Sequence, residues 1–278
     1  MRIFLPIFSF SGAALFPVIA HAALTDNFDT GTYPNSGTGW SAGWTQGAST
    51  GTMVSTDPLN GGGNYLSVTT GASSSSNTGI SRSIGTMAAS PYTLTFNWRY
   101  DGNLANFVSY DDRIHFGAST AVDYGTNPNF SWLIGVVGGD NTTNFSEGEW
   151  YFYNGSSSTT TSENTFVPGD MRMTGLFLQS GVVYSFTVTV DPASQTYSAS
   201  ISDGSGGFFN ASGLNFRNQG ATNGASNLLF GGATTGSPTA DHALTWSIDS
   251  ISVVPEPSSA VLAALSGVFC FVRRRITH

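Results

Sequence analysis

Alternation of apolar and polar residues is the dominant pattern along this chain. In residues 92–100 every second side chain is aromatic or leucine, and the residues between them are Thr, Asn and Arg. Residues 184–190 and 197–201 repeat the pattern with Ser and Thr at the polar positions. A period of two over such lengths is typical of antiparallel strands that bury one face. An Asp-Pro pair between the last two segments favours a type I turn, so residues 182–202 are predicted to form a β-hairpin.

Shorter runs of the same kind predict further strands. The predicted strands are 64–69, 79–84, 112–117, 130–137, 149–154, 171–178, 227–231 and 244–253. Three segments rich in Ser, Thr, Asn and Gly are expected to be loops: 71–78, 155–165 and 218–226. About a dozen strands without an amphipathic helix between them predict an all-β fold, in which two antiparallel sheets form a β-sandwich of the jelly-roll type.

The N-terminus has the pattern of a secretory signal peptide. Arg2 supplies the positive charge, and residues 3–19 are mostly apolar. Ala20 and Ala22 form the small-x-small pattern at which signal peptidase cuts. Residues 1–22 are therefore predicted to pass through the secretion translocon and to be removed after Ala22.

The C-terminus has three parts: a short proline motif, an apolar run and a basic cluster. They are Pro255, Glu256 and Pro257, then Ala260 to Val272, and then Arg273, Arg274 and Arg275. As a helix, residues 258–272 would extend about 22 Å at roughly 1.5 Å per residue, which is less than a bilayer core of about 30 Å. The arginines are expected to stay cytoplasmic. The order predicts a short C-terminal hydrophobic helix that inserts transiently into the membrane; the alternative is an ordinary membrane anchor.

This tail resembles the PEP-CTERM sorting signal of Gram-negative, biofilm-forming bacteria. The resemblance implies processing near the proline motif by an exosortase-type membrane transpeptidase. It also implies a location at the cell surface or in the extracellular matrix, next to exopolysaccharide. The chain then divides into a signal peptide (1–22), a β-sandwich domain (23–252) and a sorting signal (253–278).

Composition narrows the classes of function. The chain has a net charge of -8, no lysine and 13% aromatic residues. A nucleic-acid partner is not expected, because binding to phosphates requires a basic patch. Cys270 is the only cysteine and lies in the tail, so the body has neither a disulfide nor a thiolate metal site. The aromatic content argues against disorder in spite of the many small polar residues.

A second resemblance concerns the body of the chain. Residues 24–29 are similar to the opening strand of concanavalin-like (laminin-G or legume-lectin type) jelly rolls of bacterial surface proteins, and residues 246–251 are similar to the closing strand. The resemblance implies that these two segments are adjacent. It also implies carbohydrate binding or structural display, although some relatives are glycosidases or lyases.

The sequence offers little catalytic chemistry. Glycosidases need paired carboxylates, and the body contains only Glu147, Glu149 and Glu163. Glu147 and Glu149 share a strand face without a third partner at the spacing that is typical of the fold. His115 and His242 are the only histidines of the body. We therefore assign no catalytic residue and expect a non-enzymatic protein.

Aspartates near predicted turns form a candidate calcium site. Asp111, Asp112, Asp123 and Asp140 could supply the oxygen ligands that calcium prefers, and jelly-roll lectins often carry such an ion. Asp is also an ordinary turn residue. Calcium is thus the only cofactor that the sequence brings into consideration.

Aromatic residues offer candidate contacts for sugars, because pyranose rings stack on aromatic faces. Along residues 150–153 the side chains alternate between two faces, so one pair is expected in the core. Tyr151 and Tyr153 are the better candidates for exposure, since a phenol tolerates water. Trp40 and Trp44, in a glycine-rich segment, are further candidates. The alternative for all four is that they fill the sandwich or fix a loop.

These observations predict an exported surface or matrix protein that associates with carbohydrate or exopolysaccharide without catalysis. The first alternative is a polysaccharide hydrolase or lyase on a jelly-roll fold. It would gain support from two or more carboxylates that converge with Tyr or His in one groove. The second alternative is a purely structural matrix protein, which a flat sheet face of Ser and Thr would favour.

Overall fold

The computed structural model describes most of the body of the chain. The described residues are 22–30, 32–47, 50–56, 59, 63–71, 79–107, 112–119, 130–139, 147–155, 170–217, 225–234 and 243–256. They belong to a single unit, Ala22–Glu256. Nearly all of the predicted signal peptide, Pro257, the predicted C-terminal helix and the basic cluster lie outside the described residues. No helix in the described part is both long and apolar enough to cross a membrane.

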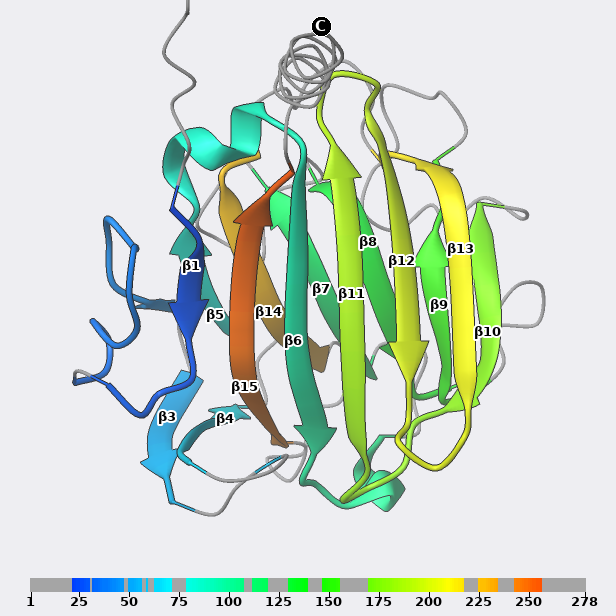
Figure 1. Cartoon of the computed structure of the whole chain (residues 1–278). Helices are drawn as coiled ribbons and strands as arrows, with labels where there is room; N and C mark the ends of the chain where they lie inside the picture. The colour runs from blue at the N-terminus through cyan, green and yellow to red at the C-terminus, as the bar shows by residue number, and fades with distance from the viewer. Residues whose placement is uncertain are drawn as a thin grey trace, which may run out of the picture. The chain divides into compact units, whose positions relative to one another are not determined.

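Two antiparallel sheets make up the described part, as predicted for an all-β sandwich (Figure 1). Sheet A has the order β13-β12-β11-β6-β15-β4-β3, and β1 pairs with β15 beside this path. Its strands are β13 (Phe208–Asn215), β12 (Thr196–Ser202), β11 (Val183–Asp191), β6 (Tyr92–Tyr100), β15 (Leu244–Pro255), β4 (Tyr65–Thr70), β3 (Thr50–Ser55) and β1 (Leu24–Asp26).

Sheet B has the order β10-β9-β8-β7-β14-β5-β2. Its strands are β10 (Met171–Phe177), β9 (Glu149–Tyr153), β8 (Phe130–Val137), β7 (Asp112–Ser119), β14 (Asn227–Thr234), β5 (Gly79–Ser83) and β2 (Thr45–Gln46). The helical elements of the described residues are two 3-10 turns, η1 (Gly85–Ala89) and η2 (Leu104–Asn106).

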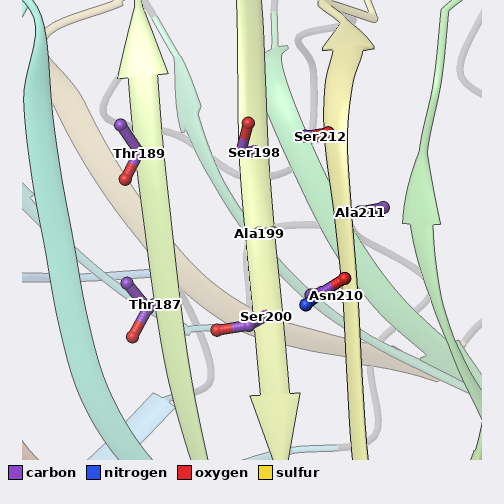
Figure 2. A pocket seen from close by; sticks show the side chains of 8 residues that line it. All are labelled: Thr187, Thr189, Ser198, Ala199, Ser200, Asn210, Ala211 and Ser212. Carbon is purple, nitrogen blue, oxygen red and sulfur yellow. The ribbon is translucent and has the colours of Figure 1, made fainter.

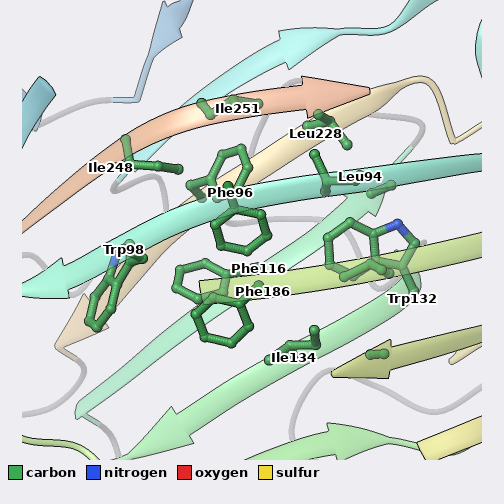
Figure 3. Packing of buried hydrophobic residues seen from close by; sticks show 14 of the residues in the cluster. Leu94, Phe96, Trp98, Phe116, Trp132, Ile134, Phe186, Leu228, Ile248 and Ile251 are labelled. Atoms are coloured by element: carbon green, nitrogen blue, oxygen red, sulfur yellow. The ribbon is translucent and has the colours of Figure 1, made fainter. Parts of the chain in front are cut away.

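The alternating pattern produces the main core between the sheets (Figure 3). Phe96 of β6 stacks on Phe186 of β11, with ring centroids 4.9 Å apart, and meets Phe116 of β7 edge-on at 5.3 Å. Trp98 and Trp132 are also fully buried in this cluster. Large rings from both sheets therefore fill the sandwich, and the burial of their apolar area is the main contribution to the stability of the fold.

The predicted hairpin is confirmed, because β11 and β12 pair antiparallel from Asp191 and Thr196 onward. The predicted adjacency of the first and last strands is also confirmed, since Leu24 of β1 lies opposite Val253 of β15. Strands β2, β3 and β13 were not predicted. In β13 the apolar pattern is broken at Gly213, whose positive φ of 66° accompanies an irregular register with β12.

A buried ion pair joins the two sheets near the N-terminus. Asp26 of β1 accepts hydrogen bonds from Arg82 of β5 at 2.6 Å, from the Trp44 indole at 2.8 Å and from Ser36 at 2.9 Å. The Arg82 guanidinium lies 4.4 Å from the centre of the Trp40 ring. The charges are thus compensated, as a buried charge requires, and the opening strand is fixed to sheet B as well as to sheet A.

Candidate functional site

The outer face of sheet A carries mostly uncharged polar residues in cross-strand rows, and we call it the hydroxyl face. Arg99, which is paired with Asp101, and the exposed Val254 and Phe208 lie on it as well. In β11 the side chains of Thr187 and Thr189 are exposed, and the residues opposite them on the two neighbouring strands are half-buried. Strand register places Thr187 opposite Thr95 of β6 and opposite Ser200 of β12. Along each strand, the residues between these positions point into the core. The alternation that builds the sandwich therefore also leaves hydroxyl groups on the outside.

Three neighbouring rows of the hydroxyl face matter here: a central row and the two flanking rows on either side of it. The central row is Ser252, Thr95, Thr187, Ser200 and Asn210, one residue from each of β15, β6, β11, β12 and β13. The row on one side contains Thr93, Thr189 and Ser198, and the row on the other contains Asn97, Ser185 and Ser202. The rows run across the strands and form a regular array of hydroxyl and amide groups.

An open hollow of about 330 Å³ lies on the hydroxyl face (Figure 2). It is lined by residues of β11, β12 and β13: Thr187, Thr189, Ser198, Ala199, Ser200, Asn210, Ala211 and Ser212. These side chains offer hydroxyl and amide groups that donate and accept hydrogen bonds. The hollow could therefore hold a polyhydroxylated ligand, and it is accessible from solvent.

Carboxylates flank the hydroxyl face. Glu256 accepts a hydrogen bond from the Thr93 hydroxyl, and its backbone N–H donates to the Pro91 carbonyl at 2.9 Å. Asp249 lies opposite Asn97. Burial, together with the neighbouring charges of Asp29 and Asp26, raises the pKa of Asp249 to about 6.

The outer face of sheet B has a different character. Its side chains form a second hydrophobic cluster, separate from the main core: Phe130, Leu133, Val137, Tyr151, Tyr153, Met171 and Leu229. All of them are buried although they lie on the side of the sheet that faces away from sheet A. This face is therefore enclosed, whereas the hydroxyl face is open.

A histidine–tyrosine pair lies within this enclosed face. His115 of β7, Gly135 of β8 and Tyr151 of β9 are consecutive cross-strand neighbours. His115 Nε2 and Tyr151 Oη are 2.7 Å apart. A Cβ atom on Gly135 would lie 2.5 Å from His115 Cδ2 and 2.5 Å from Tyr151 Oη. Glycine at this position thus lets the two side chains meet across the middle strand.

The environment keeps His115 uncharged. Burial lowers its pKa well below the usual value, and the positive charges of Arg113 and Arg217 lower it further. The Arg217 guanidinium lies 5.6 Å from the centre of the Tyr153 ring, and Tyr153 donates a hydrogen bond to Asp170 at 3.3 Å. A neutral imidazole next to a phenol can exchange a proton with a bound molecule, provided that the molecule reaches them.

The structure places the predicted aromatic contacts in the interior. Tyr151 and Tyr153 lie on the face opposite Trp150 and Phe152, as the alternation predicted, but both are buried. Their expected exposure was wrong, because the outer face of sheet B is apolar enough to form its own cluster. Their contact with a glycan stays a prediction.

Trp40 and Trp44 pack around Arg82 rather than forming an open platform. Trp44 is buried, and its indole N–H is bonded to Asp26. Trp40 is half-buried, and its indole donates to the Thr25 carbonyl at 3.0 Å. In this arrangement both rings fix the opening strand, which was the alternative that the sequence left open.

Few of the candidate acidic ligands and catalytic groups fall within the described residues. Asp112 is buried at the start of β7, and Asp111, Asp123 and Asp140 lie outside the described part. Among described residues no group of three or more His, Cys, Asp or Glu side chains is arranged to hold a metal ion. Calcium binding stays a prediction.

The glutamates of the body show no paired arrangement in the described residues. Glu149 is buried, and its carboxylate accepts a hydrogen bond from the backbone N–H of Gly175 at 2.6 Å. Glu147 is exposed in the turn before β9. Glu163 and His242 lie outside the described part. Glu149 therefore stabilises the irregular end of β10, next to its register shift.

Sequence reasoning missed both the rows of the hydroxyl face and the contact between His115 and Tyr151. The alternation showed that Thr95, Thr187 and Ser200 are on polar strand faces, but their alignment depends on the pairing of distant strands. The His115–Tyr151 pair was missed for the same reason. One available signal was Gly135, a glycine within an otherwise apolar strand, which often marks a close approach of neighbouring groups.

Comparisons with known proteins support the fold only. No protein-family model and no curated protein matches the chain. The solved PL-14 alginate lyase of the marine Aplysia kurodai is similar in structure, with a TM-score of 0.51, 10% identity and coverage of 86% of this chain and 100% of the lyase. The endo-β-1,4-glucuronan lyase of the fungus Trichoderma reesei gives a TM-score of 0.50 at 12% identity, covering 85% and 96%.

The acidic lectin of winged bean, solved with methyl-α-D-galactose, gives a TM-score of 0.45 at 11% identity and covers 84% of this chain and 98% of the lectin. At these identities the likeness to the two lyases shows a shared β-sandwich fold and leaves open whether the chain is an enzyme.

Proposed function

We propose that this chain is an exported surface or matrix protein that associates with carbohydrate through the hydroxyl face of sheet A. The observation that carries the proposal is the open hollow over β11, β12 and β13, which is lined by hydroxyl and amide groups. Such groups replace the hydrogen bonds that sugar hydroxyls make with water. The two-sheet fold supports the proposal, since solved proteins of similar structure include carbohydrate-active ones.

The proposal includes export and sorting by the two termini. The predicted signal peptide directs the chain through the translocon, and an exosortase-type transpeptidase processes it near Glu256 in a Gram-negative bacterium. Pro255 ends β15, and Glu256 is exposed at the edge of the described body. Processing at this position would cut directly after the last strand and would leave the sandwich intact.

Two experiments test this proposal. The purified protein is screened on a glycan array with and without calcium, and binding is expected in at least one condition. Failure to bind any glycan would favour the purely structural matrix protein. Replacement of Glu256 by Ala is expected to cause unprocessed protein to accumulate in the native host; normal processing of this variant would contradict the sorting assignment.

A second candidate function is a polysaccharide lyase at the outer face of sheet B, which would have to open for a polysaccharide to reach it. The observation that favours it is the 2.7 Å contact between His115 and Tyr151, with Arg113 and Arg217 close enough to lower the pKa of the histidine. A neutral imidazole can take a proton and a phenol can deliver one, while a guanidinium can pair with a sugar carboxylate. A hydrolase is less well supported, since it needs two carboxylates at a set separation.

The lyase candidate is tested by incubating the protein with alginate and glucuronan and following absorbance of the unsaturated product. If His115 and Tyr151 act in proton transfer, Tyr151→Phe should remove activity while the protein remains folded by circular dichroism. Absence of product with the unmodified protein would leave the non-enzymatic proposal in place.

A further inference from the structure

The central row of the hydroxyl face differs from the rows beside it in its hydrogen bonding. Thr93 and Thr189 bond to each other at 2.9 Å in one flanking row, and Ser185 donates to Asn97 at 2.8 Å in the other. In the described part of the chain no hydrogen bond joins the side chains of the central row to another residue. The central row thus keeps its donors and acceptors available for a ligand.

The spacing of this row is set by the sheet. Neighbouring strands lie about 4.8 Å apart, so the five positions from Ser252 to Asn210 extend roughly 19 Å across the strands. A β-1,4-linked pyranose chain advances about 5 Å per sugar, close to the strand spacing. A glycan that crosses the strands would therefore place about five successive sugars over the five members of the row.

The charges around the row select against an anionic chain. All five members of the central row are uncharged, and the carboxylates of Glu256 and Asp249 lie beside the flanking rows at Thr93 and Asn97. The whole chain has a net charge of -8. Arg99 of β6 lies on this face too, but its guanidinium is already paired with Asp101 at 2.5 Å, so a polyuronate would meet repulsion that this charge does not offset, whereas a neutral polysaccharide would not.

We propose that the central row binds a single extended, uncharged polysaccharide chain that runs across the strands of sheet A. The proposal rests on the proposed carbohydrate association and names its ligand class and its direction. Each sugar is held by hydrogen bonds from one or two strands, so affinity per sugar is low and binding depends on chain length. Because the contacts are uncharged, added salt changes the affinity little.

The test is affinity electrophoresis of the purified full-length protein in native gels that contain hydroxyethyl cellulose, a neutral β-1,4-glucan, or alginate, a polyuronate. Retardation is expected in the neutral polymer and not in alginate. The combined variant Thr187→Val and Ser200→Ala removes two hydroxyls at the centre of the row and is expected to weaken binding about tenfold, since each lost hydroxyl removes a hydrogen bond to the ligand.

Thr69→Val is the matched control. Thr69 is an exposed threonine of β4 on the same sheet, opposite Thr245 rather than in the central row. This variant should bind hydroxyethyl cellulose like the unmodified protein, and circular dichroism would verify that each variant is folded.

The possible outcomes separate this inference from the broader proposal. Retardation by alginate alone, or equal binding by the row variant and the control, would overturn the central row as the binding site and leave carbohydrate association standing. No retardation in either polymer, together with an empty glycan array, would overturn both.

Discussion

The outer faces of the two sheets hold equivalent positions in the sandwich and differ in composition and in exposure. Both are the second face of alternating strands, opposite the main core. On sheet A this face carries Ser, Thr and Asn and stays open, as at Thr187. On sheet B it carries Leu, Met and Tyr and is buried, as at Leu133. Alternation therefore defines which residues share a face, and the composition of that face decides whether it meets water.

The largest effect is expected when the buried face of sheet B loses volume. Leu133→Ala should reduce the free energy of unfolding by about 2–5 kcal/mol, because a fully buried leucine leaves a cavity. Thr187→Val on the open face should change it by less than about 0.5 kcal/mol. Urea unfolding of both variants measures the contrast. An equally small loss for Leu133→Ala would mean that this face is open to water.

Added volume at Gly135 should have the next largest effect. Gly135→Ala is expected to cost about 1–3 kcal/mol, because its Cβ would collide with His115 and Tyr151. The matched control is Gly51→Ala in β3, where the nearest atom is the Thr69 carbonyl oxygen at 3.9 Å. The same unfolding measurement should show little change for the control. Equal costs at the two sites would argue against tight packing around Gly135.

A smaller effect should come from the hydrogen bond between His115 and Tyr151. Tyr151→Phe is expected to cost about 1 kcal/mol, in the usual range for a hydrogen bond. A double-mutant cycle with His115→Leu isolates the coupling. The exposed bond between Thr93 and Thr189, tested in the same way with valine, should show weaker coupling. A cycle that gives no coupling at sheet B would show that the contact does not stabilise the fold.

The remaining predictions concern pH, and the two effects have opposite signs on the two sheets. The pKa of Asp249 is raised from 3.8 to about 6, so its folded form holds a proton that the unfolded form has lost. Its contribution to stability therefore falls as pH rises from about 4 to about 6. The pKa of His115 is lowered, so its contribution is complete above the unfolded value of about 6.5 and falls below it.

Single variants separate these two contributions. Asp249→Asn should gain stability relative to the unmodified protein at pH 7, and His115→Gln should lose less stability than the unmodified protein between pH 7 and pH 5. Thermal melts across this range measure both. Unchanged pH profiles in the variants would show that neither group titrates differently on folding.

Local patterns predicted most of the strands and the core. Residues 92–100 were assigned correctly because every second side chain is large and apolar, and the hairpin of β11 and β12 because a turn sequence separates two alternating runs. Strand β13 was missed because Gly213 interrupts its alternation. The local sequence therefore predicts a strand well when the alternation of apolar and polar residues is unbroken.

The candidate sites were much harder to predict. Thr95, Thr187 and Ser200 become neighbours only through pairings between strands far apart in the chain. The burial of Tyr151 depends on neighbours from β7, β8 and β10, and a phenol by itself fits either a wet or a dry face. The roles of Trp40 and Trp44 depended on Arg82, whose position on β5 places its charge between the two rings.

The position of β15 has a mechanical consequence. Its residues are hydrogen-bonded to β6 on one side and to β4 and β1 on the other, and the chain continues beyond Glu256 directly from its end. Hydrogen bonds of antiparallel strands are perpendicular to the strand axis. Tension applied to the C-terminal segment along β15 would load many of these bonds in shear at the same time. The strand that leads to the tail is thus held on both sides against being pulled out of the sandwich.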